Sequence, residues 1–474
     1  MRRPFPDRAH GALTNFALIA APALAQVPSF PAVEDLEGKP AGTLVLRRGT
    51  YGDRAADLGW LLVPERRSDG ESRVTRLALV RQPAVGEASE PPLFNLVGGP
   101  GQSNVFGSGE VPLALSEVSD VVRVGYRGID GEVELRCPEF VRALQTPQPL
   151  SRASIESARA ALGAERIDFL AVSWGTQIAL TYCARYPERV RRMLLVGAGG
   201  RARGFDLWDP AIIDAQLRRW GELWRQDPAA RARSADILET VRRVLEQLPR
   251  DWNGVRIECD KVRLGLWHML RTVTEAARAF DAFASAEEGE WGGLALLSWG
   301  YDEEQRRALG ERYGEHFGEF FAKVMSTGLD PERDWIADME PESALLGSPA
   351  AQLLWGAASH GGWPADAIAE GFRRDPPLAA ETLILSGNLD FASPHEYVER
   401  ELLPQLGHGR LVVLSEMGHT DVARLQPAAF EHAARRFFRE GEVDTSKFVH
   451  QPIDFTPEQR LEDLAVGLLG RRER

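Results

Sequence analysis

The sequence predicts an α/β protein in which a mostly parallel central sheet is flanked by helices and a helical cap is inserted into the chain. The first observation is that hydrophobic runs of buried-strand length alternate with turn-rich or helix-patterned segments. Such alternation is typical of a parallel sheet that is covered by helices on both faces. The second observation is that this pattern stops, gives way to helical segments, and then returns. The runs are Leu93–Val97, Val121–Val124, Ile167–Val172 and Met193–Val196.

Ahead of these runs, the chain carries short apolar stretches separated by glycine, proline, arginine and aspartate. They are Leu44–Leu46, Leu58–Val63 and Leu77–Val80. Short strands bounded by turn residues are typical of antiparallel hairpins. We therefore expect the sheet to begin with an antiparallel portion.

From about residue 203 to 377 the sequence is rich in tryptophan, arginine and glutamate and has helical periodicity. The predicted helices are Ile212–Trp224, Ala235–Leu248, Val262–Glu287 and Glu303–Val324. Strand patterns then return at Leu383–Ser386 and Leu411–Leu414, and a helix is expected over Pro427–Glu440.

These patterns divide the chain into five predicted parts. Residues 1–25 are a signal peptide, 26–202 the first part of the sheet domain, and 203–377 the helical cap. Residues 378–440 complete the sheet domain, and 441–474 form a polar C-terminal extension. Its amphipathic patch, Leu461–Leu469, is expected to pack on the surface.

The N-terminus has the pattern of an export signal. Arg2 and Arg3 precede an apolar stretch over Ala12–Ala25 that ends in a small-x-small cleavage pattern, so that cleavage would leave Gln26 first. The Arg-Arg-x-Phe start also resembles a twin-arginine signal. We expect a periplasmic or secreted protein; the alternative is a disordered tail on a cytoplasmic one.

The composition narrows the partners. With 56 Lys and Arg against 69 Asp and Glu, the net charge of −13 disfavours nucleic acid and favours a small neutral or cationic substrate. We expect a small molecule or short peptide as substrate, no nucleic-acid partner and no stable membrane insertion. The three cysteines lack zinc-binding spacing, which predicts no metal, and their odd number allows at most one disulfide. We expect no cofactor. The oligomeric state stays open.

Four loops that follow predicted strands carry the candidate chemistry, because the carboxyl ends of parallel strands gather sites. The pentapeptide Ala171–Gly175 resembles a nucleophile elbow, G-x-S-x-G, with alanine at its first position, and it presents Ser173 at the start of a helix. There the backbone N–H of Trp174 would stabilise an oxyanion. The glycine-rich turn at Gly98–Gly101 would supply a second donor, from Gly98 or Gly99.

The other two loops hold an acid and a base. Asp390 follows a buried strand and can accept the N–H of a histidine, while His419 follows Gly418 just past the next strand. The alternatives are a turn aspartate and a structural histidine. The order Ser173, Asp390, His419 predicts a catalytic triad, because it is the order found in hydrolases whose serine lies on a strand-to-helix turn.

These motifs resemble the α/β-hydrolases, and among them the branch of proline iminopeptidases and tripeptidyl aminopeptidases. The resemblance rests on Gly98–Gly101, on Tyr126–Gly128, on Ser173–Thr176 and on Tyr186–Val190. It implies a metal-independent enzyme that removes N-terminal residues from short peptides. The chain departs from the family at three places, which carry Val97, Gly125 and Ile129–Gly131 instead of the family's histidine, aspartate and small-residue tail.

The resemblance also implies cap carboxylates that bind the substrate's ammonium group. The preferred candidates are Asp302, Glu303 and Glu222; others are Glu304, Glu315 and Glu319. Each is alternatively a solvated helix residue, and the tryptophan-rich cap could instead line a pocket for an apolar acyl group.

Three functions follow from these observations. The first is an aminopeptidase-like serine hydrolase that forms an acyl-enzyme. The second is an esterase or amidase that acts on small non-peptide substrates with the same triad. The third is an inactive hydrolase fold used for binding.

Overall fold

The structure is a computed structural model. It describes residues 30–32, 36–65, 71–99, 101–106, 113–132, 153–199, 210–310, 344–347 and 378–470, with the backbone alone at 153, 154, 210 and 303–310. The predicted signal peptide lies outside the described residues, as does Cys137. Of the two described cysteines, Cys183 is buried and Cys259 is exposed, and no disulfide joins them.

A nine-stranded sheet forms the centre of the molecule, with strand order β1-β2-β3-β5-β4-β6-β7-β10-β11. The first three strands pair antiparallel, and so does β3 with β5, whereas every later pair is parallel. The predicted α/β architecture, with an antiparallel start and a parallel continuation, is therefore confirmed. The strands are β1 (Leu44–Tyr51), β2 (Arg54–Pro64), β3 (Val74–Gln82), β4 (Leu93–Leu96), β5 (Val121–Val124), β6 (Ile167–Val172), β7 (Val190–Val196), β10 (Leu378–Gly387) and β11 (Leu406–Leu414).

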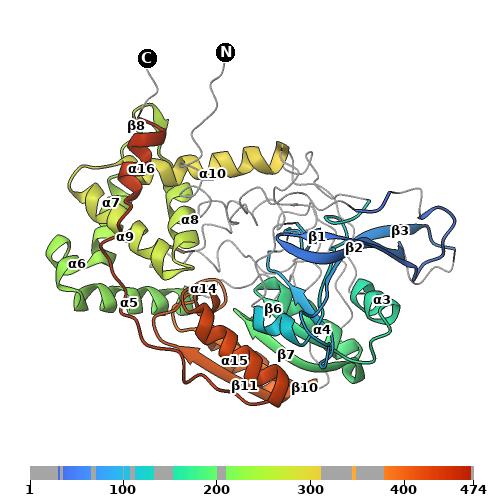
Figure 1. The fold of residues 1–474 in the computed structure, drawn as a ribbon. Helices are drawn as coiled ribbons and strands as arrows, with labels where there is room; N and C mark the ends of the chain where they lie inside the picture. The colour runs from blue at the N-terminus through green and yellow to red at the C-terminus, as the bar shows by residue number, and fades with distance from the viewer. Residues whose placement is uncertain are drawn as a thin grey trace, which may run out of the picture.

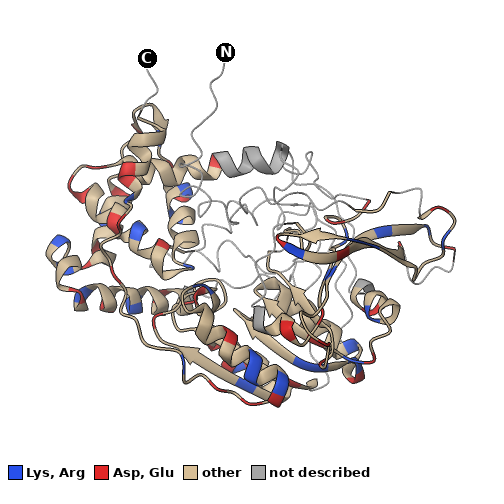
Figure 2. Ribbon diagram, viewed as in Figure 1, with Lys and Arg blue, Asp and Glu red and all other residues tan. Residues whose placement is uncertain are grey.

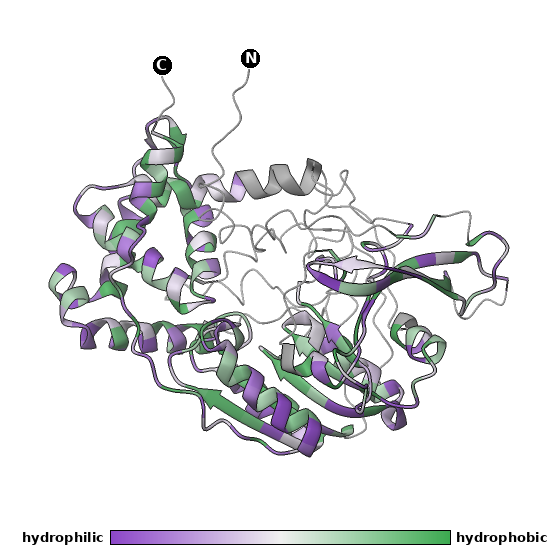
Figure 3. Ribbon diagram, viewed as in Figure 1, coloured by the Kyte–Doolittle hydropathy of each residue, from purple (hydrophilic) through white to green (hydrophobic). Residues whose placement is uncertain are grey.

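Helices cover both faces of the sheet. Alternate residues of β7 show this, because Leu195 packs in one hydrophobic core and Val196 packs in another. The first core contains side chains of α3 (Ala153–Ala161) and α4 (Trp174–Arg185), and the second contains those of α15 (Pro427–Glu440). Figure 3 shows that the buried strands are hydrophobic and that the helices are amphipathic, as this layering requires.

A group of helices leaves the sheet after β7 and returns at β10 (Figure 1). Its core contains five buried aromatic side chains from these helices, among them Trp220 and Trp224 of α5. The strands β7 and β10 are parallel neighbours in the sheet, so the helices are inserted between them in sequence but leave their pairing intact. The elements are α5 (Pro210–Gln226), α6 (Pro228–Arg233), α7 (Ile237–Glu246), the hairpin β8 (Asp251–Trp252) and β9 (Val255–Arg256), α8 (Cys259–Met269), α9 (Val273–Glu287) and α10 (Gly292–Gly310).

Two predicted helix boundaries were wrong. The helix expected from Ala235 begins at Ile237, because the Asp236 side chain caps it by accepting from two backbone N–H groups. The single helix expected over Val262–Glu287 is broken into α8 and α9 by an extended residue, Thr272. The helix expected over Glu303–Val324 is continuous with α10 as far as Gly310, and its remainder lies outside the described residues.

The C-terminal segment is more than a surface extension, because it completes the core of the helical insertion. Phe455 is buried among the rings of Trp220, Trp224 and Phe280. The short helix α16 (Leu461–Leu468) lies along the insertion helices in Figure 1, and its Leu461 side chain is buried in the same core.

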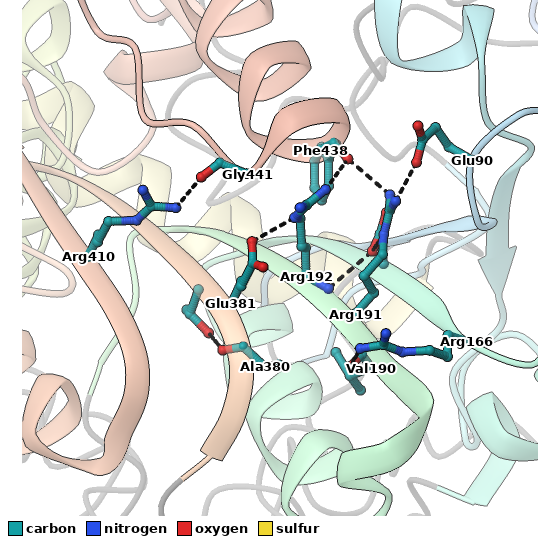
Figure 4. A network of polar contacts seen from close by, with 12 residues as sticks. Glu90, Arg166, Val190, Arg191, Arg192, Ala380, Glu381, Arg410, Phe438 and Gly441 are labelled. Carbon is teal, nitrogen blue, oxygen red and sulfur yellow. Dashed lines mark hydrogen bonds and ion pairs between the residues drawn. The ribbon is translucent and has the colours of Figure 1, made fainter.

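A polar network at the amino ends of the strands fixes α15 to the sheet (Figure 4). Arg191 and Arg192 at the start of β7 both donate to the carbonyl of Phe438, over 3.0 Å and 2.8 Å. Cations are favourable at the C-terminus of a helix, where carbonyls lack partners. Arg191 also pairs with the buried Asp168 and with Glu90. The candidate functional residues lie at the opposite, carboxyl ends of the strands.

Residues of both charges are interspersed along the helices of the insertion and along α15 (Figure 2). Arg436 of α15, for example, pairs with Glu440 one helical turn along. Among the helices of the described residues, none is both long enough and apolar enough to cross a membrane.

Candidate active site

Ser173 occupies a strained turn between β6 and α4. Its backbone angles, φ 54° and ψ −127°, are unusual for a residue with a side chain. Its N–H donates to the carbonyl of Val196 over 2.8 Å, and its own carbonyl accepts from the amide of Thr176 over 2.9 Å. A Cβ atom at Gly175 would lie 2.5 Å from the Leu96 carbonyl oxygen, so only glycine fits there. The geometry is that of a nucleophile elbow.

The glycine-rich turn after β4 lies against this elbow. A Cβ atom at Gly98 would lie 2.7 Å from Ser173 Cβ and 3.1 Å from Ser173 Oγ, so the backbone of Gly98 approaches the hydroxyl closely. Gly99, with φ +110°, faces Gln102 instead. The structure thus brings both Gly98 and Trp174, the first residue of α4, next to Ser173.

Asp390 and His419 form a buried pair. Nδ1 of His419 lies 3.0 Å and 3.1 Å from the two carboxylate oxygens of Asp390. Oδ1 of Asp390 accepts from the backbone N–H groups of Ala392 and Ser393, and Oδ2 accepts from the Ser393 hydroxyl over 2.8 Å. A carboxylate so fully bonded is held in one orientation, which in turn fixes the imidazole.

The end of β7 connects the serine to the histidine. Ser173 bonds to Val196, and the next residue, Gly197, faces the imidazole, because a Cβ atom there would lie 2.6 Å from His419 Cε1. Nε2 of His419 is buried and has no hydrogen-bond partner among the described residues. A buried imidazole nitrogen normally finds a partner, so an open Nε2 beside a serine elbow indicates a functional group.

The corner between α8 and α9 supports the histidine loop. The N–H of His419 donates to the carbonyl of Arg271 over 2.7 Å. Oδ2 of the buried Asp421 accepts from the N–H groups of Gly418 and Val273, over 2.8 Å and 2.9 Å. Asp421 therefore caps α9 and the histidine loop together, which explains why the predicted long helix breaks here.

Two further contacts extend this support. Gln216 of α5 donates from Nε2 to the carbonyl of Asp390 over 2.9 Å, and Arg219 donates to that of Asn388 over 3.1 Å.

A second histidine, His268, lies at the α8–α9 corner. Its burial, together with the nearby charge of Arg271, holds the pKa of His268 well below its usual value, so it is neutral.

Asp421→Ala is expected to lower the free energy of unfolding by about 2–4 kcal/mol, because two buried N–H groups lose their acceptor. It should also lower kcat, since the histidine loop loses its anchor. Urea unfolding and kcat per folded molecule measure both. Asp421→Asn is the matched control, because an amide oxygen still accepts from Gly418 and Val273. Equal losses in the two variants would contradict this role for the accepting oxygen.

The candidate substrate carboxylates have different surroundings. Asp302 is half exposed on α10, and its carboxylate lies 2.7 Å from Nζ of Lys261, which also pairs with Glu258. Glu222 is exposed on α5. The side chains of Glu303 and Glu304 lie outside the described part of the structure, as do Glu315 and Glu319. Binding of substrate by any of them stays a prediction.

Sequence reasoning missed three contributors to the site. Ser393 bonds to Asp390 and lies 3.0 Å from His419 Nδ1; its spacing of three residues after an aspartate and its position before a proline indicate such a turn. Gly197 and Asp421 carry no comparable signal, because their partners are distant in sequence.

Comparisons with known proteins agree with this fold. Residues 91–422 match the model of the family described as alpha/beta hydrolase fold. Over 133 residues the chain is 28% identical to tripeptidyl aminopeptidases of Streptomyces lividans and Streptomyces coelicolor. This match covers 27% of the chain and 23% of each relative, so the chain spans about a quarter of the length of these relatives.

Among solved structures, the chain is similar to a serine hydrolase from Cycloclasticus zankles, with a TM-score of 0.41 and 13% identity over 82% of this chain and 100% of that chain. It is also similar to a thermophilic esterase from Thermogutta terrifontis, with a TM-score of 0.39 and 15% identity over 80% and 98% of the two chains. From the family match and the sheet topology together, the chain belongs to the α/β-hydrolase fold family.

Proposed function

We propose that this hydrolase is a serine hydrolase that works through an acyl-enzyme, with Ser173 as nucleophile, His419 as general base and Asp390 as the residue that orients the base. The observation that carries the proposal is the buried Asp390–His419 pair, whose Nε2 has no hydrogen-bond partner among the described residues and whose imidazole lies against Gly197, the residue after the one that bonds to Ser173. A nucleophile, a base and a residue that orients the base are the parts that such chemistry needs.

The proposed reaction follows from these positions. His419 Nε2 takes the proton of the Ser173 hydroxyl as Oγ attacks the carbonyl carbon, and Asp390 stabilises the imidazolium through Nδ1–H. The backbone N–H groups of Trp174 and of Gly98 or Gly99 receive the negative oxygen. The imidazolium then gives its proton to the leaving group, and water, activated in the same way, releases the acyl group.

For the substrate, we propose short peptides with a free N-terminus, cleaved by an aminopeptidase-like activity. The support is the local similarity to tripeptidyl aminopeptidases, together with a net charge of −13 that suits a cationic substrate end. The alternative is an esterase or amidase that acts on non-peptide substrates. The surroundings of two candidate carboxylates favour it, because Asp302 already forms an ion pair with Lys261 and Glu222 is exposed.

Substrate pairs that differ only in whether the N-terminal amine is free distinguish the aminopeptidase from the esterase or amidase. Alanine and proline p-nitroanilides should be cleaved at least about 10-fold faster than their N-acetyl forms, because a charge-assisted hydrogen bond to the ammonium group contributes about 1.5–3 kcal/mol. Turnover of p-nitrophenyl esters without any turnover of the free amines would contradict the aminopeptidase and leave the esterase. Absence of all turnover and of fluorophosphonate labelling would instead support the inactive binding module.

A further inference from the structure

We propose that Tyr126 is a positioning residue for the oxyanion hole, because its hydroxyl fixes the peptide group between Val97 and Gly98 and so aims the N–H of Gly98. This inference rests on the proposed serine hydrolase. It concerns the loop after β5, which departs from the family that the sequence resembles and which has no role in the triad.

Side chains hold Val97 on both of its backbone polar groups. Its N–H donates to Oδ1 of Asn104 over 2.9 Å, and its carbonyl accepts from the Tyr126 hydroxyl over 3.1 Å. In a trans peptide the C=O and the following N–H point in opposite directions. The N–H of Gly98 therefore points away from Tyr126, and Gly98 is the residue whose backbone lies against Ser173.

Asn104 makes the support rigid. It is fully buried, and its Nδ2 group donates to the carbonyls of Asn95 and Val124, over 3.1 Å and 2.9 Å. With Val97 on its oxygen, the amide uses both donors and its acceptor. The glycine turn is thereby tied to the ends of β4 and β5, and its backbone has little freedom to rotate.

A buried carboxylate holds Tyr126 in turn. Oδ2 of Asp130 accepts from the N–H groups of Tyr126 and Asn104, both over 2.9 Å, and its Oδ1 accepts from the Ser103 hydroxyl. A Cβ atom at Gly125 would lie 2.5 Å from Asp130 Cβ. The glycine at 125, where the resembled family carries aspartate, thus leaves the space that the Asp130 side chain fills.

Tyr126→Phe removes only the hydroxyl and tests the inference. Removing one oxyanion donor costs about 10²–10³-fold in kcat, and a donor that is only misaimed should cost less, about 10–100-fold. With p-nitrophenyl butyrate, kcat should fall by this factor while KM changes less than about two-fold, since the interaction is made in the transition state. The inhibition constant of an alkyl trifluoromethyl ketone, whose adduct carries the oxyanion, should rise in parallel.

Tyr182→Phe is the matched control, because the Tyr182 hydroxyl, like that of Tyr126, makes a partly buried hydrogen bond, in this case to Glu156 over 2.6 Å. It should leave kcat and the ketone constant unchanged. Three results would overturn the inference: an unchanged kcat in Tyr126→Phe, a change confined to KM, or an equal loss of kcat in both variants. In each case kcat is expressed per folded molecule. Failure of the wild-type protein to react with a fluorophosphonate would overturn the proposed function itself, and the inference with it.

Discussion

Ser173→Ala is expected to lower kcat by on the order of 10⁶-fold, because the loss of the nucleophile alone costs about as much as the loss of a whole triad. The substitution keeps a side chain at φ 54°, so the elbow and its hydrogen bonds to Val196 and Thr176 should persist. Residual catalysis from the oxyanion donors should not exceed about 10³–10⁴-fold over water. Initial rates on the best p-nitroanilide or p-nitrophenyl ester measure the loss.

Ser173→Gly distinguishes lost chemistry from lost structure. A non-glycine residue in this backbone region carries a strain of about 1–3 kcal/mol, which glycine relieves. The glycine variant should therefore be as inactive as Ser173→Ala and more stable than it by about 1 kcal/mol or more in urea unfolding. Activity retained in either variant would exclude Ser173 as the nucleophile.

Asp390→Asn is expected to lower kcat by about 10⁴-fold with the fold intact. The oxygen of the new amide should stay at the Oδ1 position, where two backbone N–H groups donate to it. The NH₂ group then faces Nδ1 of His419 and favours the tautomer with the proton on Nε2. That tautomer cannot accept the serine proton. The pre-steady-state rate of acylation at saturating substrate measures this step alone.

Asp281→Asn is the matched control for this change. Asp281 is also buried, but it pairs with Arg233 of the helical insertion and with Arg460 of the C-terminal segment. Its replacement should lower the free energy of unfolding and leave the acylation rate unchanged. A similar loss of rate in both variants would show that the buried carboxylate acts through stability rather than through the tautomer of His419.

The sheet could be predicted from the sequence because its strands are mostly hydrophobic runs that end in glycine-containing loops. The runs that begin at Leu93, Val121 and Ile167 each form a strand in the structure. A strand that is buried on both faces is mostly hydrophobic, so it is recognised in the sequence without an alternation of polar and apolar residues. The same rule placed Asp390 and His419 in loops after neighbouring strands, β10 and β11, where the structure brings them into contact.

The helical insertion was harder to predict, because its boundaries depend on contacts across the chain. The break at Thr272 is stabilised by Asp421, which lies 148 residues beyond Val273 in sequence. Phe455 likewise joins an aromatic core formed by residues of α5 and α9. Local periodicity records neither partner. Nor does it record which carboxylates form ion pairs, as Asp302 does with Lys261.

The most direct test of the central claim is to locate the covalent adduct. The protein is treated with a fluorophosphonate, digested, and sequenced by tandem mass spectrometry. The account predicts one stoichiometric adduct, on Oγ of Ser173, that does not form in Ser173→Ala and forms far more slowly in Asp390→Asn. An adduct on another residue, or none on the folded wild-type protein, would contradict it.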